Sequence, residues 1–189
     1  MNNLFVIPGT VHHYVTHRVR DDSDVKNYMN SNTFKIGMGY DVHRLVEGRD
    51  CKIGGLKFDH AKGPLGHSDG DVLLHAICDA FLGALALGDI GDHFPPTDEK
   101  FKDMDSKQML KECYQKILDK GFVLNNLDTV IVCEEPKIKP RRLEIRELLA
   151  KLLSTELDNV SVKATTEEKM GLTGTGDAIA AWAYVSLVK

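Results

Sequence analysis

Residues 68–87 read SDGDVLLHAICDAFLGALAL, and the rest of the chain is organised around this stretch. Its apolar residues recur at helical spacing, which predicts a long helix with a broad face buried in a core. Ser68 is a suitable N-cap residue, and Asp69 and Asp71 favour the positive end of the helix dipole. We therefore expect the main helix of the protein at residues 68–87.

Strands and further helices are predicted on both sides of this helix. Short apolar or Gly-rich runs predict strands at 35–43, 51–58, 122–133, 159–165 and 178–188. Amphipathic patterns predict two more helices, at 106–120 and at 140–153, where Pro140 suits the first turn. Residues 88–105 are rich in Gly, Pro and Asp, so they predict a long ordered loop.

This alternation predicts a single layered α/β (α+β) domain, in which a mixed sheet of four to five strands packs on about three helices. The first two strands are expected to pair through a turn at residues 47–50. The last strand carries apolar residues on both of its faces, a pattern that favours burial on two sides and therefore a subunit interface. A monomer whose helices cover one face is the alternative.

Composition limits the partners of the chain. Of its 189 residues, 42% are hydrophobic and 28% charged, values typical of one folded globular domain. A formal net charge of -4 gives no field that would draw the chain onto nucleic acid, and no apolar run is long enough to cross a membrane. We expect neither as a partner. The four cysteines stand in separate segments without CxxC spacing, which indicates a reducing compartment.

Residues 1–34 lack sustained periodicity and carry three histidines beside an acidic cluster. We interpret them as an N-terminal extension, expected to be poorly ordered, that precedes a folded domain at 35–189. The histidines offer metal ligands, but no second ligand type stands at a fixed spacing, which favours a solvated tail. The segment lacks the composition of a transit peptide, so we expect a cytoplasmic location, with a plastid-like organelle as the alternative.

Asp41 and His43 are candidate metal ligands. They stand two apart on a predicted strand, so both side chains leave the same face. His75 lies on the predicted helix, where Asp71, His75 and Asp79 form a polar stripe at four-residue spacing. Two imidazoles and one carboxylate suit Zn²⁺ with a fourth position left open, which indicates catalysis. The alternative for His75 is a hydrogen-bonded histidine of the core.

Two further segments are candidates for binding phosphate. His67 and Ser68 are placed at the start of the predicted helix, where free backbone N–H groups attract an anion; a glycine-flanked capping turn is the alternative. Residues 163–169 and the Gly-rich residues 171–176 offer hydroxyls, a carboxylate and free backbone groups for a diphosphate and a hard cation such as Mg²⁺ or Mn²⁺. An ordinary turn is the alternative there, and the P-loop arrangement is absent from the sequence.

Four motifs stand in one colinear arrangement along the chain. They are Gly39-Tyr40-Asp41-Val42-His43, His67-Ser68-Asp69-Gly70-Asp71, Ala86-Leu87-Gly88-Asp89-Ile90-Gly91 with Phe94-Pro95, and Lys163-Ala164-Thr165-Thr166 with Glu168-Lys169. Together they closely resemble the 2-C-methyl-D-erythritol 2,4-cyclodiphosphate synthase family. The resemblance runs from Lys35 to Lys189 in order and without a large gap, which argues against a chance match.

The resemblance implies a lyase of the non-mevalonate isoprenoid pathway. Members convert 4-diphosphocytidyl-2-C-methyl-D-erythritol 2-phosphate to 2-C-methyl-D-erythritol 2,4-cyclodiphosphate and CMP by intramolecular phosphoryl transfer. It also implies that residues 35–189 are the catalytic domain and that the chain forms a homotrimer with each active site between adjacent subunits.

Roles for individual residues follow from the same resemblance. The implied ligands of Zn²⁺ are Asp41, His43 and His75, and an implied ligand of a second divalent cation, Mg²⁺ or Mn²⁺, is Glu168. The implied transition-state stabilisers are His67 and Thr166. Five of these six residues are also expected to contact the substrate, and His75 is expected to bind the metal alone.

The remaining expected substrate contacts fall into three sets. Those for the methylerythritol phosphate part are Asp79, Asp89, Ile90, Gly91, Phe94, Pro95, Pro96, Thr97 and Asp98. Those for the cytidine part, from the neighbouring subunit, are Cys133, Glu134, Glu135, Pro136, Lys137, Ile138, Lys139 and Thr165. The others are Val42, Ser68, Ala164, Glu167, Leu172 and Thr175. Thr175 stands where many members carry an Arg proposed to bind a phosphorylated isoprenoid.

Two other functions would use the same residues. A zinc-dependent phosphohydrolase of a nucleotide-linked substrate would use the three ligands to activate water. A non-catalytic trimeric nucleotide-binding protein would hold CDP without turnover.

Overall fold

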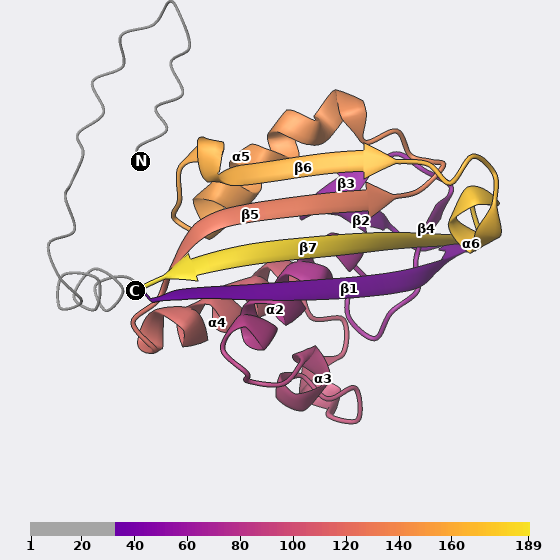
Figure 1. The fold of residues 1–189 in the computed structure, drawn as a ribbon. Coiled ribbons are helices and arrows are strands. Elements are labelled where there is room, and N and C mark those ends of the chain that lie inside the picture. Colours follow the sequence, from indigo (N-terminus) through magenta and orange to yellow (C-terminus); the bar gives the residue numbers. More distant parts are fainter. Residues whose placement is uncertain (1–32) are drawn as a thin grey trace, which may run out of the picture. The chain divides into compact units, whose positions relative to one another are not determined.

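The computed structural model describes residues 33–189, which form a five-stranded sheet with helices on one face (Figure 1). The strands lie in the order β4 (Lys62–Pro64), β1 (Phe34–Glu47), β7 (Ala178–Val188), β5 (Val123–Val132) and β6 (Val160–Thr165). β5 and β6 are parallel and the other neighbours antiparallel, so the sheet is mixed, as predicted. Residues 1–32, and with them most of the predicted extension and its three histidines, lie outside the described residues.

Three helices lie behind the sheet in Figure 1 and cover the same face of it. They are α2 (Val72–Ala84), α4 (Ser106–Asp119) and α5 (Arg142–Leu152). Each contributes fully buried side chains to a single core, such as Phe81, Leu110 and Ile145, which pack with Leu127 and Ile179 of the sheet. The predicted single layered domain is confirmed, and the predicted helices and strands at 106–120, 122–133, 159–165 and 178–188 are confirmed to within about a residue or two at each end.

The connecting segments contain short elements that the sequence did not predict. The expected loop 88–105 holds a turn of helix, α3 (Ile90–His93), and a 3₁₀ turn, η1 (Glu99–Phe101). Pro140 does not open α5 but lies in a 3₁₀ turn before it, η2 (Lys139–Arg141). A third turn, η3 (Leu157–Asn159), precedes β6, and α6 (Gly171–Gly174) precedes β7. Asp89 and Asp98 cap α3 and η1 with their side chains, which accounts for the Asp-rich composition of this loop.

The predicted pairing of strand 35–43 with 51–58 is wrong. β1 pairs instead with β7 along its length, and residues 51–58 form a separate hairpin of β2 (Cys51–Ile53) and β3 (Leu56–Phe58). Gly54 and Gly55 both have positive φ, 61° and 79°, as a two-residue hairpin turn requires. Because the chain reverses at these two glycines, β3 pairs with β2, and β1 pairs with β4 and β7 instead.

The predicted helix start at Ser68 is also wrong, because α2 begins at Val72 with Asp71 as its N-cap. Gly70 has φ +75°, a conformation that interrupts a helix. The Asp71 carboxylate accepts hydrogen bonds from the backbone N–H groups of Leu74 (3.2 Å), Gly54 (2.9 Å) and Gly55 (2.6 Å). This fully buried side chain closes the helix end, so that end is not available to an anion.

Strand β1 lies unusually close to helix α2 because the strand has glycines where they meet. A Cβ atom on Gly37 would overlap the backbone oxygen of Ala80, and one on Gly39 would overlap that of Ala76. Small residues on both elements thus allow backbone-to-backbone packing. The same face of β1 continues to Asp41 and His43, and the close approach brings them to the helix that carries His75.

The other face of the sheet, turned to the viewer in Figure 1, is apolar and exposed in the described part of the chain. On β1, Ile36 is 76% exposed and Met38 55%, and on β7 Tyr184 is 48% exposed. Tyr40 and Trp182 pack on this face with ring centroids 4.7 Å apart. Helices therefore cover only one of the two apolar faces that the sequence of β7 indicated.

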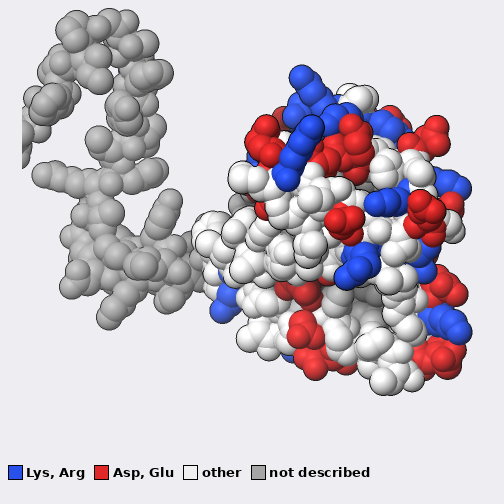
Figure 2. Space-filling model, turned by 90° about the vertical axis from the view of Figure 1, so that its right-hand side faces the viewer, with Lys and Arg blue, Asp and Glu red and all other residues white. Residues whose placement is uncertain are grey.

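The side of the molecule shown in Figure 2 carries charges of both signs around an uncharged area. Figure 2 shows Lys and Arg side chains interspersed with Asp and Glu on the side of the molecule next to the open sheet face, with no broad area of one sign. None of the helices formed by residues 33–189 combines the length and the apolar character needed to cross a membrane.

Candidate active site and metal centre

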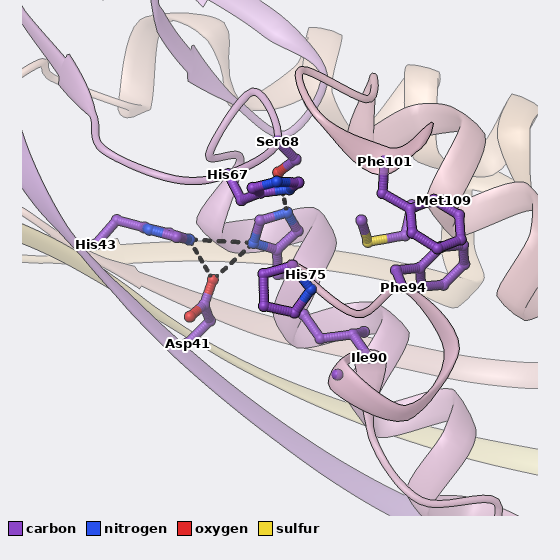
Figure 3. A pocket seen from close by; sticks show the side chains of 11 residues that line it. Asp41, His43, His67, Ser68, His75, Ile90, Phe94, Phe101 and Met109 are labelled. Atoms are coloured by element: carbon purple, nitrogen blue, oxygen red, sulfur yellow. Dashed lines mark hydrogen bonds and ion pairs between the residues drawn. The ribbon is translucent and has the colours of Figure 1, made fainter. Parts of the chain in front are cut away.

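Asp41, His43 and His75 converge at the edge of a cavity between β1 and α2 (Figure 3). His43 Nε2 and His75 Nδ1 each lie 2.9 Å from Asp41 Oδ2, and the two nitrogens are 3.1 Å apart. Ligands about 2.0 to 2.1 Å from a tetrahedral Zn²⁺ are separated by about 3.3 Å, close to these distances. The donor set therefore fits a divalent cation. The three side chains would occupy three of its four tetrahedral positions, so the fourth position is open to a further ligand.

The ring of His43 is held in one orientation. Its Nδ1 atom lies 2.6 Å from the carbonyl oxygen of Leu65. Because a carbonyl only accepts, Nδ1 donates, and the neutral ring then presents the lone pair of Nε2 to Asp41 and His75. Such a partner behind the ring is the usual arrangement for a metal-binding histidine.

The charges of this group favour an ionised Asp41. Burial acts to raise the pKa of Asp41, but hydrogen bonds and charge from His43 and His75 outweigh it and lower that pKa well below its ordinary value. Burial acts to lower the pKa of His43. The hydrogen bond between His43 and Asp41 outweighs burial, so the pKa of His43 is raised. The carboxylate is thus ready to bind a cation, while the proton on His43 competes with it.

The cavity beside the three ligands has a volume of about 250 Å³. Of the predicted site residues it is lined by Asp41, His43, His67, Ser68, His75, Ile90, Gly91, Phe94 and Pro96. Phe101 and Met109 also line it and were not predicted; with Phe94 they form an apolar side opposite the ligands (Figure 3). Sequence reasoning missed them because nothing in their local pattern distinguishes a cavity wall from a core.

The segment of His67 and Ser68 is fixed by its backbone rather than by a helix. The carbonyl of His67 accepts from the N–H of Asp103 at 2.9 Å, and the carbonyl of Ser68 accepts from Arg49 Nη2 at 2.9 Å. Ser68 is buried, and its Oγ lies 3.0 Å from His75 Nε2. The side chain of His67 is exposed toward the cavity, where it is free to meet a ligand.

A second cavity, of about 280 Å³, lies where β5 and β6 end. Its walls are Cys133, Pro136, Lys137, Ile138, Lys139, Ala164, Thr165 and Thr166, all predicted as site residues. Burial raises the pKa of Cys133 to about 12, so this thiol stays protonated and acts as an apolar wall. The two cavities have no lining residue in common.

Thr166 leads from this second cavity into an irregular loop. Its hydroxyl donates to Glu168 Oε1 at 2.9 Å, and Glu168 and Lys169 both have positive φ, 51° and 64°. Gly174 supports the loop, since a Cβ there would lie 2.6 Å from the backbone of Lys169. Strained backbone of this kind is common at functional sites. Glu168 is exposed and is not one of the three clustered ligands.

Several predicted site residues line neither cavity. They are Val42, Asp79, Asp89, Pro95, Thr97, Asp98, Glu134, Glu135, Glu167, Glu168, Leu172 and Thr175. Val42 points to the open face of the sheet, 45% exposed. Asp79 accepts from the N–H of Ile90 at 2.8 Å and so anchors α3 beside the first cavity. The predicted stripe of Asp71, His75 and Asp79 therefore serves three different purposes.

Comparison with known proteins places this fold and site in a family. The chain is 54% identical over 154 residues to 2-C-methyl-D-erythritol 2,4-cyclodiphosphate synthase of Xanthomonas oryzae pv. oryzae (strain PXO99A), covering 82% of this chain and 94% of that protein. It is 53% identical over 156 residues to the enzyme of that name from Synechococcus elongatus (strain ATCC 33912 / PCC 7942 / FACHB-805), covering 82% and 98%.

A solved structure of 2C-methyl-D-erythritol-2,4-cyclodiphosphate synthase in its CDP-bound form is similar to this one with a TM-score of 0.75 and 36% sequence identity. The match covers 81% of this chain and 99% of that one. The model of the YgbB family matches residues 34–188, nearly the whole described part of the chain. The chain therefore belongs to the YgbB family.

Proposed function

We propose that this protein is a 2-C-methyl-D-erythritol 2,4-cyclodiphosphate synthase, a lyase that cyclises 4-diphosphocytidyl-2-C-methyl-D-erythritol 2-phosphate and releases CMP. The observation that carries the proposal is the group of Asp41, His43 and His75 at one cavity, in a chain about half identical to enzymes of that name. The bacterial relatives support a cytoplasmic location.

The reaction needs positioning more than covalent chemistry. An oxygen of the 2-phosphate attacks the β-phosphorus and forms a new P–O bond, while the bond from that phosphorus to the bridging oxygen breaks and CMP leaves with its electrons. No protein nucleophile takes part. Holding the two ends of one flexible molecule together in the reactive geometry can supply about 7 to 11 kcal/mol of the barrier.

The residues of the first cavity would bind and orient the phosphates. Asp41, His43 and His75 would hold a divalent cation, proposed to be Zn²⁺, which supplies Lewis-acid neutralisation of diphosphate oxygens. His67 reaches the same cavity and offers a ring N–H to oxygens that gain charge in the transition state. The apolar side formed by Phe94, Phe101 and Met109 would exclude water from the attack.

The second cavity would bind the cytidine end of a substrate. Its walls combine the apolar side chains of Pro136 and Ile138 with the basic side chains of Lys137 and Lys139. Thr166 would donate to phosphate, and Glu168, its hydrogen-bond partner, would hold a second cation such as Mg²⁺ or Mn²⁺. Because the two cavities of one chain share no wall, we propose that a complete site combines the metal cavity of one subunit with the cytidine cavity of its neighbour.

A homotrimer is the assembly proposed for this arrangement. The exposed apolar face of β1 and β7 supports it, since single chains rarely leave so continuous an apolar surface in water. A cyclic assembly also gives every subunit the same pair of half-sites.

The test is the product formed by the metal-loaded full chain from the CDP-linked substrate, in water enriched in the heavy oxygen isotope. Mass spectrometry should show CMP and a cyclic diphosphate without the heavy isotope. A linear product carrying it would identify a phosphohydrolase, and bound but unchanged nucleotide would identify a binding protein. His75→Ala, examined in parallel with its metal content, should form no cyclic product.

A further inference from the structure

His75 has two buried hydroxyl groups behind its ring. Nδ1 faces Asp41, 2.9 Å from Oδ2, while Nε2 lies 3.0 Å from Ser68 Oγ and 3.0 Å from Ser106 Oγ. Ser106 is fully buried at the first residue of α4, and His75 is 5% exposed. The nitrogen that faces away from the metal position therefore meets two buried protein hydroxyls.

Ser106 in turn donates to Asp69, whose carboxylate is surrounded by donors. Oδ1 accepts from Ser106 Oγ and from the N–H of Asp71 (3.3 Å), and Oδ2 accepts from the N–H of Ser106 (3.3 Å) and from Lys52 Nζ (3.3 Å). Burial acts to raise the pKa of Asp69, but the Ser106 hydroxyl and the charge of Lys52 outweigh it and lower that pKa. The carboxylate is ionised at neutral pH and only accepts.

A count of protons then sets the tautomer of His75. Ser106 has one hydroxyl proton, and Asp69 takes it, so Ser106 Oγ presents only lone pairs to His75 Nε2. Nε2 must therefore be the donor. In the neutral ring this leaves the lone pair of Nδ1 free toward Asp41 and His43. The opposite tautomer would place two lone pairs 3.0 Å apart in a buried site, which is costly.

Ser68 does not make this selection. Its Oγ accepts from the N–H of Gly70 at 3.3 Å, and its own proton has no other assigned partner among the described residues. It can accept from a protonated Nε2 or donate to a bare one, so it suits either tautomer of His75.

We propose that Asp69 and Ser106 are positioning residues that hold His75 in the tautomer protonated at Nε2, with Nδ1 free to bind a divalent cation. The inference rests on the proposed function only in treating Asp41, His43 and His75 as a metal site. Neither residue touches the metal position. Lys52, at the outer end of this relay, holds the second oxygen of Asp69.

The test is the dissociation constant for Zn²⁺, measured by competition with a chelator on the assembled full-length protein. Asp69→Asn keeps the size of the side chain but adds an amide donor. Directed at Ser106, this donor releases the serine proton to His75 Nε2 and selects the wrong tautomer. Its dissociation constant should rise about 10- to 100-fold, as for other residues that orient metal ligands. Ser106→Ala should weaken binding less, because Ser68 remains, and Ser106→Thr should restore it.

Thr129→Val is the matched control, because it also removes a fully buried hydroxyl, one that donates to the carbonyl of Ser161 at 3.0 Å in the sheet. It should leave the affinity for Zn²⁺ unchanged. The proposal is overturned if Asp69→Asn and Ser106→Ala bind Zn²⁺ as tightly as the unaltered protein. It is also overturned if Thr129→Val loses as much affinity for Zn²⁺ as these two variants. Since turnover is not measured, a failure of cyclisation would leave this result intact.

Discussion

At the residue scale, the candidate centre depends on the partners behind each ligand. His43 is oriented by the carbonyl of Leu65, and His75 by hydroxyls on its far side. Asp41 joins the two rings through one oxygen, and its other oxygen, Oδ1, accepts from the N–H of Val42 at 2.8 Å. The three side chains are therefore arranged before any cation arrives, which reduces the entropy lost on binding.

Asp79 gives a prediction about pH. Burial is the main cause that raises its folded-state pKa above the ordinary 3.8, so the folded state binds the proton more tightly than the unfolded state. Asp79 therefore costs stability as pH rises from about 3.8 through the raised pKa. Asp79→Asn, whose amide oxygen can still accept from Ile90, should gain stability relative to the unaltered protein over that range. Urea unfolding of the two metal-free proteins at several pH values measures the difference in their free energies of unfolding. A difference that stays constant or falls as pH rises would contradict the prediction.

Thr166 gives a prediction about rate. Its hydroxyl is half-buried and donates to Glu168, beside the second cavity. Thr166→Ala should lower the turnover rate by about 100-fold, the typical effect of removing one donor to a transition state, with unchanged Zn²⁺ content. Thr155→Ala is the control and should keep full activity, because it also removes a half-buried hydroxyl with one hydrogen bond, which it accepts from Asn159 Nδ2 at 3.1 Å. Equal rates in both variants would remove the role proposed for Thr166.

At the element scale, two backbone contacts bring the ligands together. Gly37 and Gly39 let β1 lie directly on α2, which places Asp41 and His43 at the level of His75. At the start of α2, Asp71 ties the helix to the β2–β3 hairpin through the backbone of Gly54 and Gly55. The helix is thus fixed along its side and at its end, and its histidine has little freedom to move from the strand.

Gly39→Ala tests the strand contact. The new methyl group would overlap the backbone of Ala76 and Ala80, so strand and helix must separate. We expect a loss of about 1 to 3 kcal/mol in the free energy of unfolding and weaker Zn²⁺ binding. Gly83→Ala is the control, because a Cβ there lies 3.8 Å from the oxygen of Met38 and alanine favours a helix. Denaturant unfolding measures the stability of both variants. If Gly39→Ala and Gly83→Ala are equally stable, the strand contact does not require glycine at position 39.

At the scale of the whole molecule, the chain has one covered and one open sheet face. The two cavities that hold predicted site residues share no lining residue, and each holds only part of the predicted site. Ile36, Met38 and Tyr184 leave a large apolar area in water. Both features are explained together if copies of the chain meet along this face and complete each other's sites.

Ile36→Asp tests the assembly. A carboxylate at this 76% exposed position would be buried without a partner in any interface formed by the open face. Native mass spectrometry should show the unaltered protein as the proposed trimer and Ile36→Asp as monomers, with loss of turnover. Leu143→Asp is the control, since Leu143 is 53% exposed on α5, which covers the opposite face, and it should leave the trimer intact. A trimer that survives Ile36→Asp would place the interface elsewhere.

The local pattern of the sequence determined a large part of this protein. Short apolar or Gly-rich runs predicted the strands around Asp41, Leu127 and Ile179. Apolar residues at a spacing of 3.6 predicted the helices around His75 and Leu110, because burial of one face dictates this spacing. Asp41 and His43 were predicted to share a face for the same reason, and the structure places them with His75. The motifs around these residues also predicted the family.

Tertiary structure alone decided the partners that lie far apart in the chain. Residues 51–58 form their own hairpin, which turns at Gly54 and Gly55. Asp71, which contacts that hairpin, is the N-cap of α2 in place of Ser68. The side chain of Ser68 therefore faces His75. Ser106 lies 31 residues from His75 in the chain. The sequence around it predicted only the start of a helix, and not its contact with His75. Periodicity reports which side of an element is buried, but not which buried group it meets, because that depends on how elements distant in the chain pack together.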